Sequence, residues 1–264
     1  MTQGRLGGGS GWVAQLERRR AARLGRMRAT LFGRPEEWPR RDLIGYSDAF
    51  DATLALEAYR SGVFPMPLNA AEMGWWSPVM RGLLPVQGLR VTRSLGKMVK
   101  RYRTTTDRQF DAVLARCADP RRDGAWIDSR IAAAYRRLHE EGWAHSVEVW
   151  NDEGLLVGGL YGVQIGGLFA GESMFHDRHR GRDASKVALV RLAVELVASG
   201  VVLLDVQWLT EHLGTLGAYE VSRDEYLRRL QPALELPARP WPIQAPMPGE
   251  ELLRAWRELR ATHR

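Results

Sequence analysis

The stretch HSVEVWNDEGLLVGGLYGVQIGGLFAGESMF, residues 145–175, decides the fold. Its apolar and β-branched residues fall into three short runs, which are separated by Asp-Glu-Gly at 152–154 and by a glycine pair at 166–167. Runs of this composition between turn residues predict strands, and such short turns join neighbouring strands in antiparallel order. The stretch therefore predicts an antiparallel meander of three strands.

The segment after the meander predicts a helix and a further strand. Residues 183–200 predict a long helix with Asp183 as its cap, and VVLLDVQWLT at 201–210 predicts a buried strand. A short helix is expected from about residue 210 to residue 217. The order of three strands, helix, strand and helix is that of acetyltransferase-like (GNAT-like) acyltransferases. We therefore expect an α+β fold, a mixed α/β architecture with a mostly antiparallel sheet.

The rest of the chain predicts smaller elements and a division into four parts. Helices are expected at 48–62, 107–117, 129–142 and 250–260, short strands and loops at 63–85, and proline-rich coil at 232–248. The four expected parts are a basic, helical N-terminal extension (1–40), a small N-terminal domain (41–105), an acetyltransferase-like catalytic domain (106–231) and a proline-rich segment with a C-terminal helix (232–264).

Composition narrows the class of protein. The chain has 264 residues, 45% of them hydrophobic, and no apolar run is long enough to cross a membrane. Its start, MTQGRLGGGSGW, lacks the apolar segment of a secretory signal, and the lone Cys117 cannot form an internal disulfide. We therefore expect a cytoplasmic protein. The net charge of +7 favours an anionic partner, either nucleic acid or acidic lipid, and a merely soluble surface is the alternative.

Two clusters carry the positive charge. Six arginines and no acid lie between Arg18 and Arg28, on a segment with helical spacing of apolar residues, and a second cluster begins at Lys97. Several cations acting together favour contact with RNA phosphates, although each cluster alone could be a solvated helix face. The residues predicted to contact RNA phosphates are Lys97, Lys100, Arg101, Arg18, Arg19 and Arg23.

An acid and an amide interrupt the buried strand at 201–210. Side chains alternate between the two faces of a strand, so Asp205 and Gln207 are expected on one face, with Leu204 and Val206 on the other. Burying a carboxylate is costly unless it is paired or hydrogen-bonded. The pair therefore either satisfies the end of a strand or serves a functional site.

The residues resemble the leucyl/phenylalanyl-tRNA–protein transferases. Ordered matches cover roughly residues 43–230, among them AYRSGVFPM (58–66), WWSPVMRGLLP (75–85), AYRRLHEEGWAHSVEVW (134–150) and LLDVQWLTEHLGTLGA (203–218). The resemblance implies a cytoplasmic, monomeric bacterial enzyme without metal or coenzyme. Its expected activity is the transfer of leucine or phenylalanine from tRNA to proteins with N-terminal Arg or Lys, which marks them for N-end rule degradation. Methionine is left open as a third donor.

The resemblance also implies the catalytic residues. The reaction is aminolysis of an ester by an α-amine, whose pKa near 8 leaves it partly protonated at neutral pH. Asp205 is expected to supply negative potential and to attract the cationic side chain of the acceptor. Gln207 is expected to position the amine or to relay its proton. Glu172 matches a carboxylate that helps to define the aminoacyl site.

Further positions are implied to bind substrate. Leu160, Leu192, Leu196 and Leu204 match the pocket for the donor side chain. Better-known members have phenylalanine at the two positions on the helix, 192 and 196, so the donor preference stays open. Trp126 matches a tryptophan that stacks on the terminal adenosine.

Three more positions complete the implied binding site. Met66 stands where many members have a second stacking tryptophan. Tyr59 and Tyr135 match tyrosines of the site region. By contrast, we interpret Trp75 and Trp76 as core residues.

Two other functions are weighed against this one. A coenzyme A-dependent N-acetyltransferase would need a glycine-rich pyrophosphate loop before the long helix, where the chain has HDRHRGRDASK. A non-catalytic RNA-binding protein is favoured only if Asp205 and Glu172 are structural. The six histidines form no pattern of metal ligands, and His145 is expected to be a structural residue at a strand start.

Overall fold

The computed structural model describes residues 32–122, 124–237, 239, 241 and 246–261. The chain divides into two compact units, Met1–Arg40 and Arg41–Arg264. The described part of the first unit contains one short 3-10 helix, η1 (Pro35–Glu37). The predicted arginine-rich helix, with Arg18, Arg19 and Arg23, lies outside the described residues.

The second unit begins with a small antiparallel sheet, ordered β1-β3-β2. Its elements are β1 (Leu43–Ser47), β2 (Phe64–Pro67) and β3 (Met73–Trp76), with helix α2 (Ala52–Arg60) between the first two in sequence. The Asp51 carboxylate caps α2 by accepting a hydrogen bond from the Leu54 N–H at 2.8 Å. Trp75 is buried, and Trp76 packs edge-on against Trp208. The sequence prediction of short strands and of Trp75 as a core residue is confirmed.

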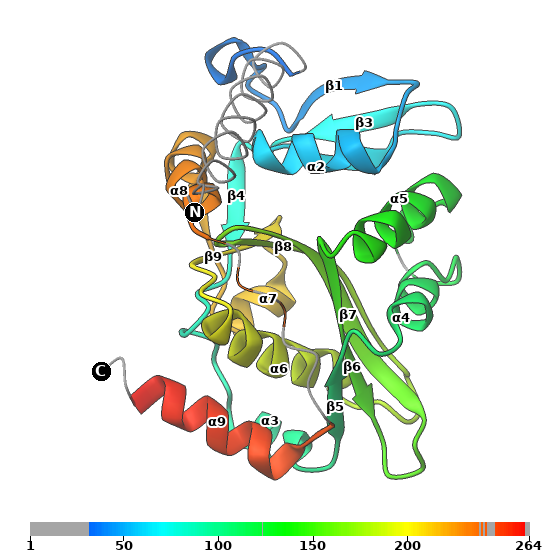
Figure 1. Ribbon diagram of the computed structural model, residues 1–264, viewed down its shortest axis with the longest axis vertical. Coiled ribbons are helices and arrows are strands. Elements are labelled where there is room, and N and C mark those ends of the chain that lie inside the picture. The colour runs from blue at the N-terminus through cyan, green and yellow to red at the C-terminus, as the bar shows by residue number, and fades with distance from the viewer. Residues whose placement is uncertain (1–31, 123, 238, 240, 242–245, 262–264) are drawn as a thin grey trace, which may run out of the picture. The chain divides into compact units, whose positions relative to one another are not determined.

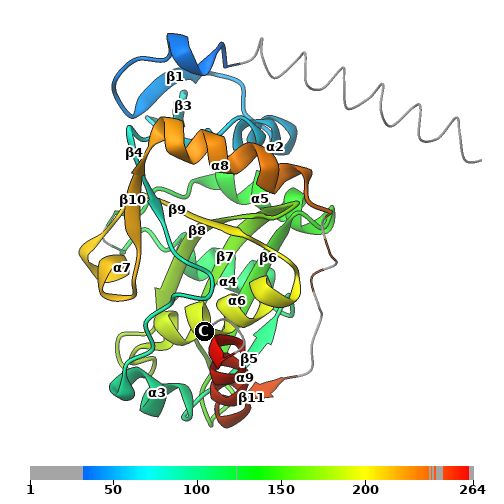
Figure 2. The same ribbon diagram turned by 90° about the vertical axis from the view of Figure 1, so that its left-hand side faces the viewer.

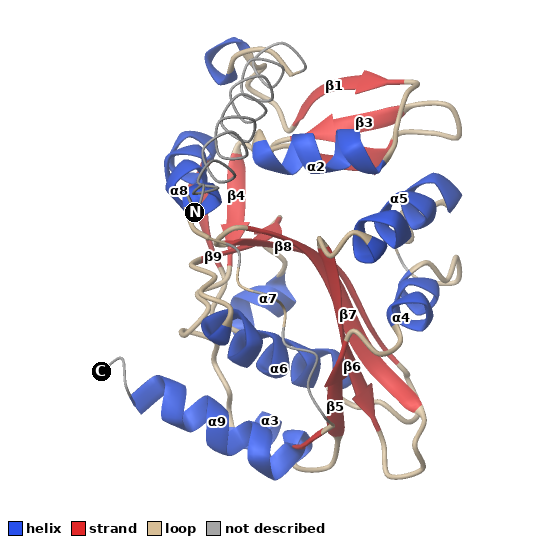
Figure 3. Cartoon of the chain, viewed as in Figure 1, coloured by secondary structure: helices blue, strands red, loops and turns tan. Residues whose placement is uncertain are grey.

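An eight-stranded sheet forms the larger part of the unit (Figures 1 and 3). Its order is β10-β4-β9-β8-β7-β6-β5-β11. The strands are, in chain order, β4 (Met80–Leu83), β5 (Arg103–Thr106), β6 (Ala144–Trp150), β7 (Leu156–Ile165), β8 (Leu168–His176), β9 (Leu203–Gln207), β10 (Tyr219–Ser222) and β11 (Met247–Pro248). The meander β6-β7-β8 is antiparallel, as its turn residues predict.

One strand pair makes this sheet mixed. β9 returns beside β8 in the parallel direction, because the helix α6 between them carries the chain back across the sheet. On its other side, β9 pairs with the antiparallel β4, so it lies between β4 and β8 (Figure 2). β4 and β5 precede residue 107 but belong to the large sheet. The small sheet therefore ends at Trp76 and the large sheet begins at Met80, whereas the sequence predicts that the small domain ends at residue 105.

Helices cover both faces of the large sheet. Along the chain they are α3 (Arg93–Val99), α4 (Phe110–Cys117), α5 (Ser129–Glu140), α6 (Ala184–Ala198), α7 (Glu211–Thr215), α8 (Arg223–Glu235) and α9 (Gly249–Ala261). α4 and α5 lie on one side of the meander, and α6 lies on the other, with α3 and α9 packed against it (Figure 1). The sheet is thereby buried along β6, β7 and β8.

Local predictions were wrong at two helix ends. Asp183 occupies the position before α6, but its φ is 57° and its carboxylate accepts from the Lys186 ammonium at 2.8 Å instead of capping the helix. Pro232 was expected in coil but lies inside α8. The buried Leu230 and Ala233 keep this part of α8 packed, and this tertiary contact offsets the hydrogen bond that a proline cannot donate.

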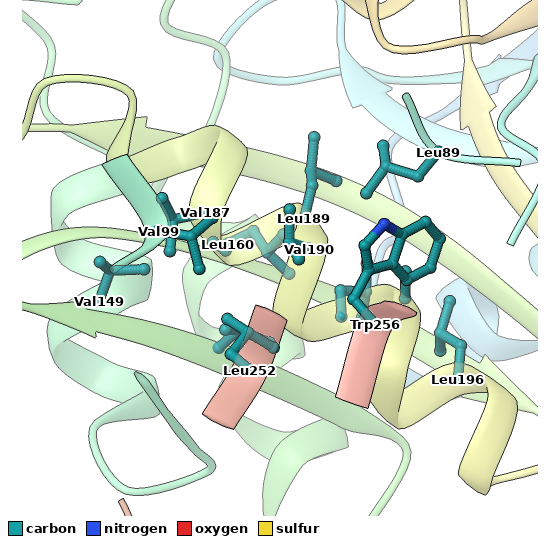
Figure 4. Close-up of a cluster of buried hydrophobic side chains, with 14 of the residues drawn as sticks. Leu89, Val99, Val149, Leu160, Val187, Leu189, Val190, Leu196, Leu252 and Trp256 are labelled. Carbon is teal, nitrogen blue, oxygen red and sulfur yellow. The ribbon is translucent and has the colours of Figure 1, made fainter. Parts of the chain in front are cut away.

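The main hydrophobic core lies between α6 and the sheet. Trp256 of α9 packs in it with Leu89, Leu189 and Leu196 (Figure 4). Leu252 of the same helix has no exposed surface at all. The C-terminal helix is thus part of the core and not a surface appendage.

Candidate active site

Asp205 lies at the centre of β9 with 0% of its surface exposed. Its carboxylate accepts two hydrogen bonds from the Arg81 guanidinium of β4, from Nε at 2.8 Å and from Nη2 at 2.5 Å. The Tyr226 hydroxyl of α8 donates a third at 2.8 Å, and the Gln207 backbone N–H donates a fourth at 2.9 Å. Every side of the carboxylate is therefore occupied by protein.

Arg81 is enclosed as completely as its partner. The guanidinium lies over the Phe64 ring at 4.8 Å and over the Tyr226 ring at 4.3 Å. Burial alone would lower the pKa of Arg81, but the charge of Asp205 outweighs it and raises that pKa. The expectation that Asp205 offers its charge to a cationic acceptor is wrong, because Arg81 neutralises it inside the core.

Sequence reasoning missed Arg81 and Tyr226. A detectable signal was present: Arg81 stands in a short run with apolar neighbours, as Asp205 does in its own strand. Two opposite charges in two buried strands predict an ion pair, since a single buried charge is too costly.

The backbone at Gln207 reverses the face expected for its side chain. Its φ is 57°, in the left-handed region, and the pairing of β4 with β9 shifts register between Gly82 and Leu83. Gln207 consequently lines a pocket together with Leu204 and Val206, while Asp205 faces Arg81. The prediction that Asp205 and Gln207 share a face was wrong, because a register shift interrupts the alternation of side chains.

Glu172 of β8 is the carboxylate of this pocket. It accepts a hydrogen bond from the Tyr135 hydroxyl at 3.0 Å and one from the Gln207 amide at 3.3 Å. The Tyr135 hydroxyl is also hydrogen-bonded to that of Tyr59. Burial raises the pKa of Glu172 to about 7, and the Asp205 charge acts in the same direction, although hydrogen bonds from the tyrosines oppose both. Near neutral pH this carboxyl group can therefore both accept and release a proton.

The pocket beside Glu172 has a volume of about 130 Å³. Its wall is mainly aliphatic, and it includes three of the leucines expected there, Leu160, Leu192 and Leu204. Leu189 and Tyr161, which sequence reasoning missed, also line it. Within the described residues, the buried Tyr161 hydroxyl has no hydrogen-bond partner. The lining therefore combines aliphatic side chains with the polar side chains of Glu172 and Gln207.

Two family models match this chain. The family model described as leucyl/phenylalanyl-tRNA protein transferase matches residues 83–231, and the model of the N-terminal domain of the same transferase matches residues 48–79. The chain belongs to the leucyl/phenylalanyl-tRNA protein transferase family. It is an aminoacyltransferase that transfers leucine or phenylalanine from tRNA to proteins.

Several curated relatives of this transferase are named leucyl/phenylalanyl-tRNA–protein transferase. That of Afipia carboxidovorans is 45% identical over 78% of this chain and 93% of its own. Those of Ruegeria sp. and Rhizorhabdus wittichii are 48% and 50% identical, each over 70% of this chain, and over 88% and 76% of their own. Among solved structures, that of L-PGS from Bacillus licheniformis matches 50% of this chain and 48% of its own, with 10% identity and a TM-score of 0.38.

Three other residues predicted for the transferase site are buried and are not among the described residues that line the pocket. Leu196 is completely buried in the core and is not among the pocket-lining residues, so α6 turns Leu189 and Leu192 toward the pocket instead. Tyr59 and Tyr135 are buried, and burial raises the pKa of both hydroxyls well above the usual value. Both tyrosines therefore stay protonated and act as hydrogen-bond donors.

Two residues predicted to bind the terminal adenosine lie outside the pocket lining. Met66 is on β2, and Trp126 is in the loop before α5. Both side chains are half-buried.

The remaining predicted residues of the transferase are exposed or structural. Lys97, Lys100 and Arg101 lie on or directly after α3 and are exposed. His145 is structural, as expected: its ring is hydrogen-bonded to the Asp107 carboxylate at 2.7 Å and stacks on Trp241.

Among the residues that the structure describes, no three histidine, cysteine, aspartate or glutamate side chains form a possible metal site. Across the same residues, every helix is too short or too polar to span a bilayer.

Proposed function

We propose that the pocket between α6 and β8 holds the side chain of the donor amino acid, with its ester carbonyl beside Glu172 and Gln207. The aliphatic side chains suit leucine or phenylalanine, and Glu172 and Gln207 suit the α-amine and the ester. The observation that carries this proposal is a carboxyl group with a pKa of about 7 among the lining residues of a mainly aliphatic pocket.

In the proposed reaction, Glu172 accepts the proton of the attacking amine. The acceptor nitrogen forms a bond to the carbonyl carbon, the ester bond to the tRNA ribose breaks, and the proton passes to the leaving ribose oxygen. Gln207 orients Glu172, because its amide donates to the carboxylate at 3.3 Å. Asp205 is a positioning residue, since it accepts the Gln207 backbone N–H and holds Arg81.

The finer identity of the substrates follows from the resemblance and from the charge. We propose that the acceptors begin with Arg or Lys, attracted by the ionised Glu172, and that the product enters N-end rule degradation in the cytoplasm. Trp126 and Met66 are proposed to contact the terminal adenosine, and the α3 cations the tRNA phosphates. We also propose an acetyltransferase-like catalytic domain that starts at Met80, which is supported by the place of β4 in the large sheet.

The direct test is transfer of labelled leucine from leucyl-tRNA to a peptide that begins with Arg, beside one that begins with Glu. We expect the Arg peptide to react and the Glu peptide to remain unmodified. Equal labelling of both peptides would mean that Glu172 does not select the acceptor. Acetylation of the Arg peptide from acetyl-coenzyme A, without transfer from tRNA, would overturn the proposal.

Donor preference should respond to the size of residue 192. Replacing Leu192 with Phe fills part of the 130 Å³ pocket. The kcat/KM for transfer of phenylalanine should therefore fall more than the kcat/KM for transfer of leucine. We expect the phenylalanine-to-leucine ratio of kcat/KM to fall by about tenfold, within the range for a few methylene groups in a pocket. Competition between Leu- and Phe-tRNA in one reaction measures this ratio directly.

Leu196→Phe is the matched control, because it adds the same volume on the same helix outside the pocket. It should lower stability by about 1–3 kcal/mol through overpacking but leave the donor ratio unchanged. An equal shift of the ratio in both variants would mean that residue 192 acts through the packing of α6.

A further inference from the structure

A second concave surface lies between α3 and α9, away from the proposed catalytic pocket. It is a groove of about 650 Å³ with Leu253 and Trp256 among its lining residues. Among the described residues that line it, five are cationic and none is acidic; the five are Arg93, Lys97, Lys100, Arg257 and Arg260. Three come from α3 and its end, and two come from α9.

The charges of this groove are largely uncompensated. All five cations are exposed, and Lys100 is paired with Glu250 at 2.9 Å. Within the described residues, the other four form no ion pair with an acid. Like charges gathered on one surface repel each other, and an anion bound among them relieves that repulsion. The chemistry of the groove therefore favours an anionic ligand.

The position of α9 is fixed by specific contacts. Leu252, Leu253 and Trp256 are buried in the main core. Gly249 starts the helix where a Cβ atom would lie 1.9 Å from the Val99 carbonyl oxygen, so only glycine allows this close approach to α3. The groove is thus a preformed surface. The family match ends at residue 231, so α9 lies beyond it.

The relation of the groove to the pocket indicates the kind of ligand. α6 lines the pocket through Leu189 and Leu192 and also packs against α3 and α9. A helix with its side chains is about 10–12 Å across, so the groove cannot touch the amino acid held in the pocket. A substrate that reaches both places must extend across α6 and carry negative charge where it meets the groove. The donor tRNA meets this requirement, and the cationic acceptor does not.

We propose that the α3–α9 groove binds the sugar–phosphate backbone of the donor tRNA, at a distance from its aminoacylated end, and that Arg257 and Arg260 contribute to this contact. The inference rests on the proposed function. It adds a contact from the C-terminal helix to the cations expected on α3. Arginine suits this role because its planar guanidinium donates two parallel hydrogen bonds to a phosphate.

The test compares two donors in the intact protein. Arg257→Ala/Arg260→Ala should raise the KM for full-length leucyl-tRNA about tenfold with kcat unchanged. It should leave transfer from a leucylated CCA trinucleotide unaffected, because that donor is too short to reach the groove. Each lost phosphate contact reduces the steepness of the plot of log affinity against log salt by about 0.7–0.9. The slope of the double variant should therefore be shallower than that of the wild type by about 1.5.

Arg254→Ala is the matched control, since Arg254 is exposed on α9 but does not line the groove. It should leave KM and the salt slope close to those of the wild type. Thermal unfolding of all variants shows whether α9 remains in place.

Three results would overturn the inference. They are an unchanged KM and salt slope in the double variant, an equal rise of KM for the trinucleotide, and a rise of KM for the acceptor protein alone. The last of these would mean that the groove binds protein. If the wild type transferred leucine from neither donor, the proposed function would fail, whereas the salt dependence of tRNA binding would still test the groove.

Discussion

Asp205→Asn should lower the free energy of unfolding by about 3–5 kcal/mol and remove most of the transfer activity. The substitution removes the charge that faces the buried Arg81 guanidinium at 2.5 Å, and it turns an amide group toward donors. Breaking a buried ion pair from one side costs this much, because the remaining charge is left without water or a partner. Urea denaturation of the two proteins at pH 7 measures the difference.

The double variant Arg81→Met/Asp205→Leu separates folding from activity. Replacing both partners of a buried ion pair by apolar side chains is often neutral for stability, so most of the lost free energy should return. Transfer should stay low, because the Gln207 backbone N–H has lost its acceptor at 2.9 Å. If transfer returned with stability, the ion pair would be structural alone and Asp205 would have no part in positioning Gln207.

Glu172→Gln should reduce kcat/KM for transfer by about 100-fold or more, the usual contribution of a general base. The sign of the pH dependence follows from the raised pKa of about 7: the carboxyl group is protonated and inactive below this pH and becomes a base above it. The wild-type rate should therefore rise through pH 7. The variant should lack this step and keep the later rise from the acceptor amine, whose pKa lies near 8.

Glu148→Gln is the control for this experiment. Glu148 is a buried acid on β6 whose pKa is also raised by burial, but Thr105 and Ser146 donate to it and it does not line the pocket. Its replacement should leave the pH profile of transfer intact. A Glu172→Gln enzyme that retained the rise through pH 7 would show that another group accepts the proton.

The elements that local patterns determine could be predicted from the sequence. The meander, the helix from Ser129 and the long helix before β9 each follow from periodicity and turn residues. Leu160 and Leu204 were assigned to the pocket through family resemblance, and the structure brings them there together with Glu172. The predicted elements depend on short-range order, which a sequence carries directly, whereas the two leucines were placed by the resemblance and not by any local pattern.

The errors arose where distant segments meet. Arg81 and Asp205 are separated by 124 positions, and no periodicity indicates which buried charges form a pair. The face of Gln207 depends on a register shift against β4. The choice between Leu189 and Leu196 depends on how α6 is rotated over the sheet, because both are apolar residues of one helix.

The left-handed backbone of Gln207 has a consequence for attempts to make this enzyme heat-resistant. A residue with a side chain costs about 1–2 kcal/mol in this conformation, and glycine does not. Selection for thermal tolerance alone would favour glycine at this position. The amide that reaches Glu172 would then be lost. Heat resistance and turnover are thus opposed at a single residue, and screening for both together is the way to keep the amide.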